Sequence, residues 1–73
     1  MMVKIEIATE FIQLSQLLKL LNWVENGSMA HQVVDEGLVA VNGMKATERR
    51  KKIRPGDVVS FDNQMVRIEK QAV

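Results

Sequence analysis

The order of apolar and polar positions predicts a strand at the start of the chain, followed by a helix. Residues 3–7 alternate apolar and charged side chains, which is the period of a half-buried strand. From Leu14 to Leu21, leucines recur at the i, i+3, i+4, i+7 spacing of an amphipathic helix. Residues 9–13 fit neither period. We therefore expect the apolar stripe that begins at Leu14 to pack in the core.

A second helix is predicted between Asn26 and Gly37. Asn26 or Ser28 can cap its first turn by accepting a hydrogen bond from an unpaired backbone N–H. Gly37 is placed to end the helix in the left-handed conformation. Two helices this close in sequence predict an αα-hairpin. We expect four residues to form the buried face of this helix: Met29, Ala30, Val33 and Val34.

The remaining apolar runs predict strands joined by tight turns. Residues 38–41 form a short β-branched run, and Asn42-Gly43 is a strong hairpin signal because both residues tolerate positive φ. Residues 44–47 should return antiparallel to this strand. Pro55-Gly56 fits the centre of a type II turn because proline fixes φ and glycine accepts a positive φ.

The last third of the chain predicts two more strands. Residues 58–61 form one of them, and Asp62-Asn63 is a turn signal. Residues 65–68 form the other, which could pair with the strand at the start of the chain.

Length and composition limit the class of protein. A chain of 73 residues with 47% hydrophobic and 26% charged residues fits one small domain over residues 1–73. It has no cysteine, which excludes disulfides and thiolate chemistry. The first ten residues carry no secretory signal pattern, and no apolar run is long enough for a membrane span, so we expect a cytoplasmic protein.

The distribution of positive charge is the main functional signal. The net charge is only +1, but six of the ten Lys and Arg residues lie between Lys45 and Arg54. Glu48 is the one acidic residue in that interval. A cluster of positive charge on a nearly neutral chain favours a polyanionic partner such as nucleic acid.

Several of these motifs, in this order, resemble the RNA-binding domain named after ribosomal small-subunit protein four, here called the S-four domain. The resemblance spans about residues 12–61. Its most specific parts are Leu14–Lys19, Ala30–Val34, Glu36–Gly43 and Arg54–Asp57. The chain is most similar to the short bacterial members, in which the domain makes up almost the whole protein.

The resemblance implies an α+β fold known as the alpha-L motif. Two short helices would pack on a small curved antiparallel sheet, with terminal strands at residues 2–7 and 64–69 on either side of the motif. RNA would lie against the helices and the basic loop. Gln13, Ser15, Gly27 and His31 stand where many members carry charged residues, so the resemblance implies that the loop supplies a larger share of the phosphate contacts.

Ten residues are the candidate RNA-binding residues. Lys and Arg can each place a charge near a phosphate, and arginine can bind it through two hydrogen bonds. If four of the loop residues bind single-stranded RNA, log K should fall with log salt at a slope of about −3, from roughly −0.7 per phosphate. The candidates are Gln16, Lys19, His31, Gln32, Lys45, Arg49, Arg50, Lys51, Lys52 and Arg54.

Other chemistry is poorly supported by the sequence. Ser28, His31 and Asp35 share a polar helix face, but no nucleophile turn or anion-stabilising loop accompanies them. A metal site would lack ligands, and Asp35-Glu36 reads as surface charge. We therefore expect no enzyme activity, no metal and no cofactor. Phe11, Trp23 and Phe61 are expected in the core or at its rim, which favours recognition of RNA shape over reading of stacked bases.

The sequence thus predicts a non-catalytic module that binds structured RNA, with ribosomal RNA or a ribosome assembly intermediate favoured over transfer RNA. Two alternatives stay open. One is a protein-interaction adaptor that uses the sheet and an exposed Met or Trp, and the other is an in-trans accessory subunit of an RNA-modifying enzyme. DNA also stays open as a ligand, because phosphate contacts alone do not separate the two nucleic acids.

Overall fold

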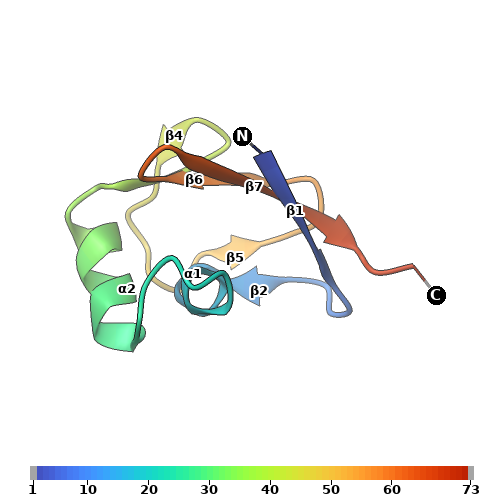
Figure 1. Ribbon diagram of the computed structural model, residues 1–73, viewed down its shortest axis with the longest axis horizontal. Helices are drawn as coiled ribbons and strands as arrows, with labels where there is room; N and C mark the ends of the chain where they lie inside the picture. The colour runs from blue at the N-terminus through green and yellow to red at the C-terminus, as the bar shows by residue number, and fades with distance from the viewer. Residues whose placement is uncertain (1, 73) are drawn as a thin grey trace.

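The computed structural model describes residues 2–72, which form two layers (Figure 1). A sheet makes one layer, and the helices with a second, two-stranded sheet make the other. The elements in chain order are β1 (Met2–Ile7), β2 (Ile12–Gln13), α1 (Leu14–Leu20), α2 (Gly27–Asp35), β3 (Val39–Val41), β4 (Met44–Lys45), β5 (Lys52–Ile53), β6 (Val58–Phe61) and β7 (Gln64–Lys70).

The larger sheet has the strand order β1-β7-β6-β3-β4. Strands β7, β6, β3 and β4 are antiparallel neighbours. The turn signals predict the hairpins β3–β4 and β6–β7, and the pairing of β3 with β6 joins the two hairpins. The expected pairing of the terminal strands is confirmed, but β1 runs parallel to β7, with Met2 opposite Met65. A parallel pair requires a long connection between its strands, and here the helices and the other strands together provide it. The alternation of side chains that revealed β1 carries no information about this direction.

The two-stranded sheet β2–β5 was not predicted. Ile12 lies opposite Ile53 and Gln13 opposite Lys52. Strands of two residues are too short to produce a periodic pattern, which is why residues 9–13 fitted neither period. The predicted basic loop is therefore not wholly irregular, because Lys52 belongs to β5.

Both predicted helices are present. In α1, Leu14, Leu17 and Leu18 are fully buried, as the leucine spacing predicts. Asn26 caps α2, and its side chain accepts a hydrogen bond of 2.9 Å from the backbone N–H of Met29. Neither helix is long and apolar enough to cross a membrane.

The prediction for the buried face of α2 is wrong at one residue. Ala30 and Val34 are buried and Val33 is half-buried, but Met29 is 39% exposed. Because α1 and the sheet cover only one side of α2, a single i, i+4 line reaches the core, and Met29 lies beside that line.

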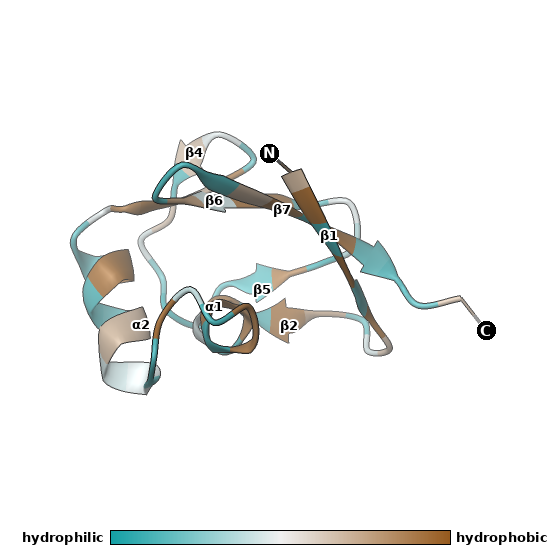
Figure 2. Cartoon of the chain, in the orientation of Figure 1, coloured by the Kyte–Doolittle hydropathy of each residue, from teal (hydrophilic) through white to brown (hydrophobic). Residues whose placement is uncertain are grey.

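The core lies between the two layers. Val39, Val41, Val59, Val66 and Ile68 are buried on the side of the sheet that faces the helices. Figure 2 shows apolar positions along these strands and along α1, whereas the connections are mostly polar. Trp23 and Phe61 lie at the rim of the core, with ring centroids 6.3 Å apart. The alternating strands and the leucine stripe therefore bury their apolar sides against each other.

The three predicted turns adopt the expected backbone conformations. Asn42 and Gly43 have φ of 52° and 82°, which suits a two-residue hairpin between β3 and β4. Asp62 and Asn63 also both have a positive φ. Gly56 has a φ of 99°, and the N–H of Asp57 donates to the carbonyl of Arg54 at 3.0 Å, as in a type II turn.

Asn42 connects the β3–β4 hairpin to the Pro55-Gly56 turn. Its side-chain Nδ2 donates to the Asp57 carboxylate at 3.0 Å, and its Oδ1 accepts from the N–H of Val58 at 2.9 Å. The Asp57 carboxylate also accepts from the N–H of Arg54 at 2.9 Å. One asparagine thus supplies both a left-handed residue and a link between two turns.

Replacing Asn42 by alanine should destabilise the fold more than the same change at Asn63. Asn63→Ala removes a residue suited to positive φ, which costs on the order of 1 kcal/mol. Asn42→Ala should cost about 1–3 kcal/mol more, because the Asp57 carboxylate and the Val58 N–H also lose a partner. Urea unfolding of both variants measures the difference. Equal losses would show that the link to Asp57 contributes nothing to stability.

Candidate nucleic-acid interface

The backbone of the basic segment, defined as Arg49–Lys52, is fixed to the start of α1. The N–H of Leu14 donates to the carbonyl of Lys51 at 2.9 Å, and the N–H of Ser15 donates to the carbonyl of Arg49 at 3.1 Å. The first amides of a helix have no partner within the helix, and the N-cap residue Gln13 provides no side-chain cap here. The basic segment therefore takes the place of a capping side chain, and this holds its residues in one conformation.

Arg49 connects the basic segment to the end of α2. Its Nε and Nη2 donate to the two carboxylate oxygens of Asp35 at 3.2 and 2.7 Å. Arg49 lowers the pKa of the Asp35 carboxyl, first through this hydrogen bond and also through its charge, and the charge of His31 adds to the effect. Partial burial of the carboxyl opposes the shift. The basic segment is thus attached to both helices, and one of its charges is partly neutralised.

Lys52 is placed by an aromatic side chain. Its Nζ lies 4.9 Å from the centroid of the Phe11 ring, which is the geometry of a cation–π contact. Phe11 is half-buried, in keeping with the predicted position at the rim of the core. Lys52 consequently points over the connection between β1 and β2.

Arg50 and Lys51 are the members of the basic segment most available to a ligand. Both are exposed. Among the described residues, the ion pair is the one between Arg49 and Asp35. The side chains of Arg50 and Lys51 therefore remain in solvent. Their backbone is nevertheless held against α1 through the neighbouring carbonyls.

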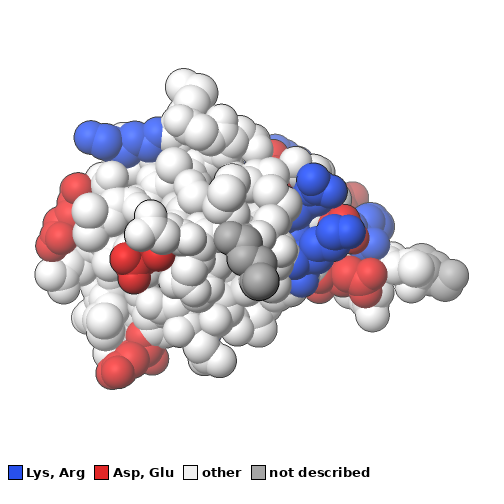
Figure 3. All heavy atoms as spheres, turned by 45° about the horizontal axis from the view of Figure 1, so that its top comes forward, with Lys and Arg blue, Asp and Glu red and all other residues white. Residues whose placement is uncertain are grey.

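One of the six positive residues predicted as one region, Arg54, lies apart from the basic segment. Arg54 lies in the turn that hydrogen-bonds to β7, through Gly56 N–H and Ile68 carbonyl at 2.7 Å. In Figure 1 this turn lies beyond β5, on the side away from α2. Figure 3 turns the sheet layer toward the viewer and shows the Lys and Arg atoms of that face at its edges, around a largely uncharged area. The basic segment lies in the other layer.

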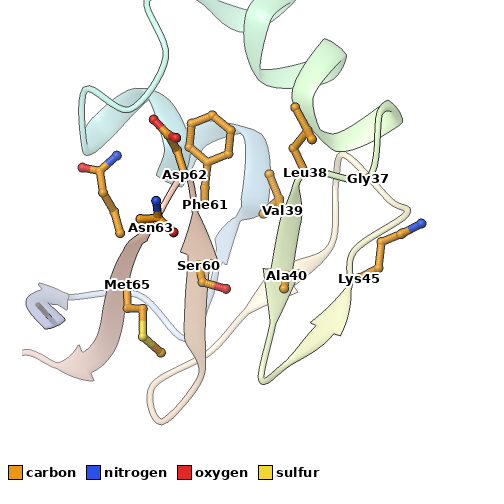
Figure 4. Close-up of a pocket in the computed structure, with 11 residues that line it drawn as sticks. Gly37, Leu38, Val39, Ala40, Lys45, Ser60, Phe61, Asp62, Asn63 and Met65 are labelled. Carbon is orange, nitrogen blue, oxygen red and sulfur yellow. The ribbon is translucent and has the colours of Figure 1, made fainter.

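Lys45 lies outside the basic segment in the sequence, on β4 next to the end of α2, but it lines one hollow together with Lys51 of that segment. Its side chain covers Gly37 so closely that an added Cβ at Gly37 would lie 2.9 Å from the Lys45 Cε. Figure 4 shows Lys45 at the rim of a second, shallow hollow of about 490 Å³ between the sheet and the end of α2. Leu38, Ala40, Ser60 and Met65 also line this hollow. No residue of the basic segment lines it.

The four helix candidates are at or near the surface. Gln16 and Lys19 are exposed and lie three residues apart on α1, so they share a face. Gln32 donates from its side chain to Glu36 at 3.0 Å. His31 is half-buried, one turn before Asp35. The structure thus brings Gln16 near the basic segment through its neighbour Ser15, whereas His31 and Gln32 approach it through Asp35.

Sequence reasoning missed two residues of this arrangement. Asp35 was read as surface charge, and Phe11 as an ordinary aromatic of the core rim. Asp35 and Arg49 are 14 positions apart, and Phe11 and Lys52 are farther apart still. No periodic pattern connects residues on different elements at such distances.

The pairing of Arg49 with Asp35 predicts a measurable titration. The pKa of Asp35 should lie below the ordinary value of 3.8 and return toward it in Arg49→Ala. Because the folded-state pKa is lowered, the pair stabilises the fold above the unfolded pKa, and this contribution is lost as pH falls through the folded pKa. The carboxyl carbon shift of Asp35, followed by NMR against pH, reports it. Arg50→Ala is the matched control, and an equal shift there would contradict the specific pair.

Comparison with known proteins identifies the family of this chain. A family model described as S4 domain, the S-four domain of the sequence analysis, matches residues 5–69. A protein of Escherichia coli (strain K12) named "Putative RNA-binding protein YbcJ" is 40% identical over 57 residues, which cover 78% of this chain and 81% of that protein. A protein of Bacillus subtilis (strain 168) named "Probable ribosome maturation protein RlbA" is 40% identical over 58 residues, covering 80% and 82%.

A solved structure agrees with these matches. The solution structure of YbcJ from E. coli is described as revealing an alfaL motif involved in RNA-binding. It is 34% identical to this chain, covers 93% of it and 85% of YbcJ, and gives a TM-score of 0.66. The predicted α+β fold with two helices on a small sheet is confirmed by this likeness. The chain belongs to the S4 domain family.

Proposed function

We propose that this chain binds structured RNA through the basic segment and the adjoining face of the helices. The observation that carries the proposal is the attachment of Arg49–Lys52 to α1 by the amides of Leu14 and Ser15. Because the backbone is held, Arg50 and Lys51 can present their charges to phosphate without the entropy cost of ordering a free loop. The names of the E. coli and B. subtilis relatives support the same conclusion.

The proposed contacts differ in kind. Arg50, Lys51 and Lys52 would contact phosphates, and Arg49 would contribute less because Asp35 already binds its guanidinium. Gln16, Lys19, His31 and Gln32 would fix the orientation of the RNA on the helices. Lys45, which lines a hollow together with Lys51, would contact the same ligand, whereas Arg54 would meet only a ligand that extends beyond the basic segment.

We propose ribosomal RNA or a ribosome assembly intermediate as the target. This rests on the relative named as a ribosome maturation protein. A shape-based mode of recognition suits the site, since Phe11 is occupied by Lys52 and Trp23 packs with Phe61. These aromatic rings are therefore poorly placed to stack on unpaired bases.

We further propose that the chain catalyses no reaction. Asp35 is the residue that could orient His31 in a triad with Ser28, but both of its carboxylate oxygens accept hydrogen bonds from Arg49. A general base needs an orienting partner of that kind. The same side chains that resemble a triad in sequence thus serve to attach the basic segment.

An adaptor function is the second candidate, favoured by apolar residues on the surface of the sheet layer. Met44 is 74% exposed and Leu38 is 52% exposed. Recovery of ribosomal particles with the tagged protein separates the two functions. RNase should abolish this recovery if RNA is the partner, and should leave it unchanged if the chain acts as an adaptor or as an accessory subunit of an enzyme.

RNA binding through the basic segment predicts a specific change in salt dependence. The Arg50→Ala, Lys51→Ala double variant should reduce the slope of log K against log salt by about 1.4 to 1.8, because it loses two phosphate contacts at roughly 0.7 each on a single strand or 0.9 each on a duplex. Fluorescence anisotropy with a labelled RNA hairpin that contains an internal bulge measures it. A DNA hairpin of the same sequence tests the contribution of the 2′-hydroxyls.

The matched control removes the same number of charges elsewhere. Arg67→Ala with Lys70→Ala takes two positive, exposed side chains from β7 in the sheet layer. It should leave the slope nearly unchanged. An equal loss in both double variants would mean that the RNA senses only net charge, and an unchanged slope in the first would reject the site.

A further inference from the structure

Among residues 2–72, strand β1 has no partner on its outer side and leaves that edge of the larger sheet unpaired. It pairs with β7 on one side and ends the strand order on the other. Figure 1 shows β1 at the front of the sheet, crossing β7, with no labelled element along its outer side. Six residues make it long for an edge strand, and an exposed edge can pair with another chain.

The backbone groups that face this edge can be assigned. The N–H of Gln71, just after β7, donates to the carbonyl of Ile7 at 2.9 Å, so the polar groups of Ile7 face β7. Backbone groups of successive strand residues point to opposite edges. Those of Lys4 and Glu6 consequently point outward, where an additional strand could bind them.

The side chains of the same two residues are poorly matched within the chain. Lys4 lies directly opposite Arg67, and Glu6 directly opposite Glu69. Like charges in facing positions of a sheet repel each other. Figure 3 shows basic and acidic atoms side by side at the right-hand end of the molecule. A strand added on the outer side of β1 could place an opposite charge beside each of them.

We propose that a second copy of this chain pairs antiparallel along β1 and joins the two five-stranded sheets into one. The sequence Val3–Ile7 is self-complementary in this direction. With Ile5 opposite Ile5 of the second copy, Lys4 lies opposite Glu6 and Glu6 opposite Lys4. Both are residues whose backbone groups face the edge, so each pair can exchange two backbone hydrogen bonds.

The neighbouring registers are excluded by charge and by the pleat. A shift of two residues in either direction places Lys4 opposite Lys4 or Glu6 opposite Glu6. A shift of one residue turns the apolar side chains to the opposite face and mismatches the backbone groups. One register therefore satisfies the hydrogen bonds, the charges and the apolar residues together.

Apolar surface is also buried in this register. Val3 is 50% exposed and Ile5 is half-buried in the single chain. Val3 would meet Ile7 of the second copy on the side that faces the core. On the other face, Arg67 and Lys4 of one chain would be followed by Glu6 and Glu69 of the second copy. An attractive pair of Lys4 with Glu6 would then lie at the junction, between two like-charged pairs. The basic segment lies in the other layer, so this contact does not depend on RNA binding.

Charge reversals test the register without damaging the fold. Lys4→Glu and Glu6→Lys each turn both intermolecular pairs repulsive, and the dimer dissociation constant should rise by roughly tenfold or more. Each change also replaces a like-charged neighbour in β7 by an opposite one, so the folded chain should be retained. Sedimentation velocity over a range of protein concentrations measures association, and far-UV circular dichroism checks the fold.

Two rescue experiments make the test specific. A mixture of Lys4→Glu and Glu6→Lys chains should form heterodimers, because glutamates of one chain then face lysines of the other. The double variant carrying both changes should dimerise like the wild type. A wild type that stays monomeric at the highest soluble concentration would overturn the proposal. So would single variants that still dimerise, or a mixture that does not.

Discussion

The hydrogen bonds between the start of α1 and the basic segment are the constraint on which the arrangement of the molecule depends. They satisfy amides of Leu14 and Ser15 that would otherwise lack a partner, and they hold four consecutive positive residues in place. Each bond contributes only about 0.5–1.5 kcal/mol. The β2–β5 pair and the full burial of Ile53 extend the same attachment. A run of like charges therefore lies in an ordered position despite its mutual repulsion.

Electrostatics in this protein are decided by neighbours rather than by the formal count of charges. Arg49 is held by Asp35, Lys52 lies over Phe11, and Lys45 covers Gly37 beside the end of α2. Exposed ion pairs contribute little to stability, so the pair of Arg49 with Asp35 matters mainly for position. It joins the basic segment to the second helix and at the same time reduces the charge that this arginine can offer to a polyanion.

The two layers divide the surface between two kinds of contact. The helical layer carries the charged groups proposed for RNA, whereas the sheet layer ends in an unpaired strand whose charges face like charges. A small domain has a limited total surface, and this division allows the RNA contact and the contact along β1 to form at the same time. The position of β1 at the end of the strand order creates the second surface, and its parallel register sets Lys4 opposite Arg67 and Glu6 opposite Glu69.

The amino-acid sequence by itself determined the local elements: the leucine stripe of α1, a cap of α2 at Asn26 or Ser28, the positive-φ turns at Asn42-Gly43 and Gly56, and the family. These features depend on residues close together in the chain, so periodicity and turn chemistry reveal them. Only the tertiary structure decided the direction of β1, the β2–β5 pair, and which positive residues share a surface. Those outcomes depend on contacts between distant residues, such as Arg49 with Asp35, and no local pattern encodes them.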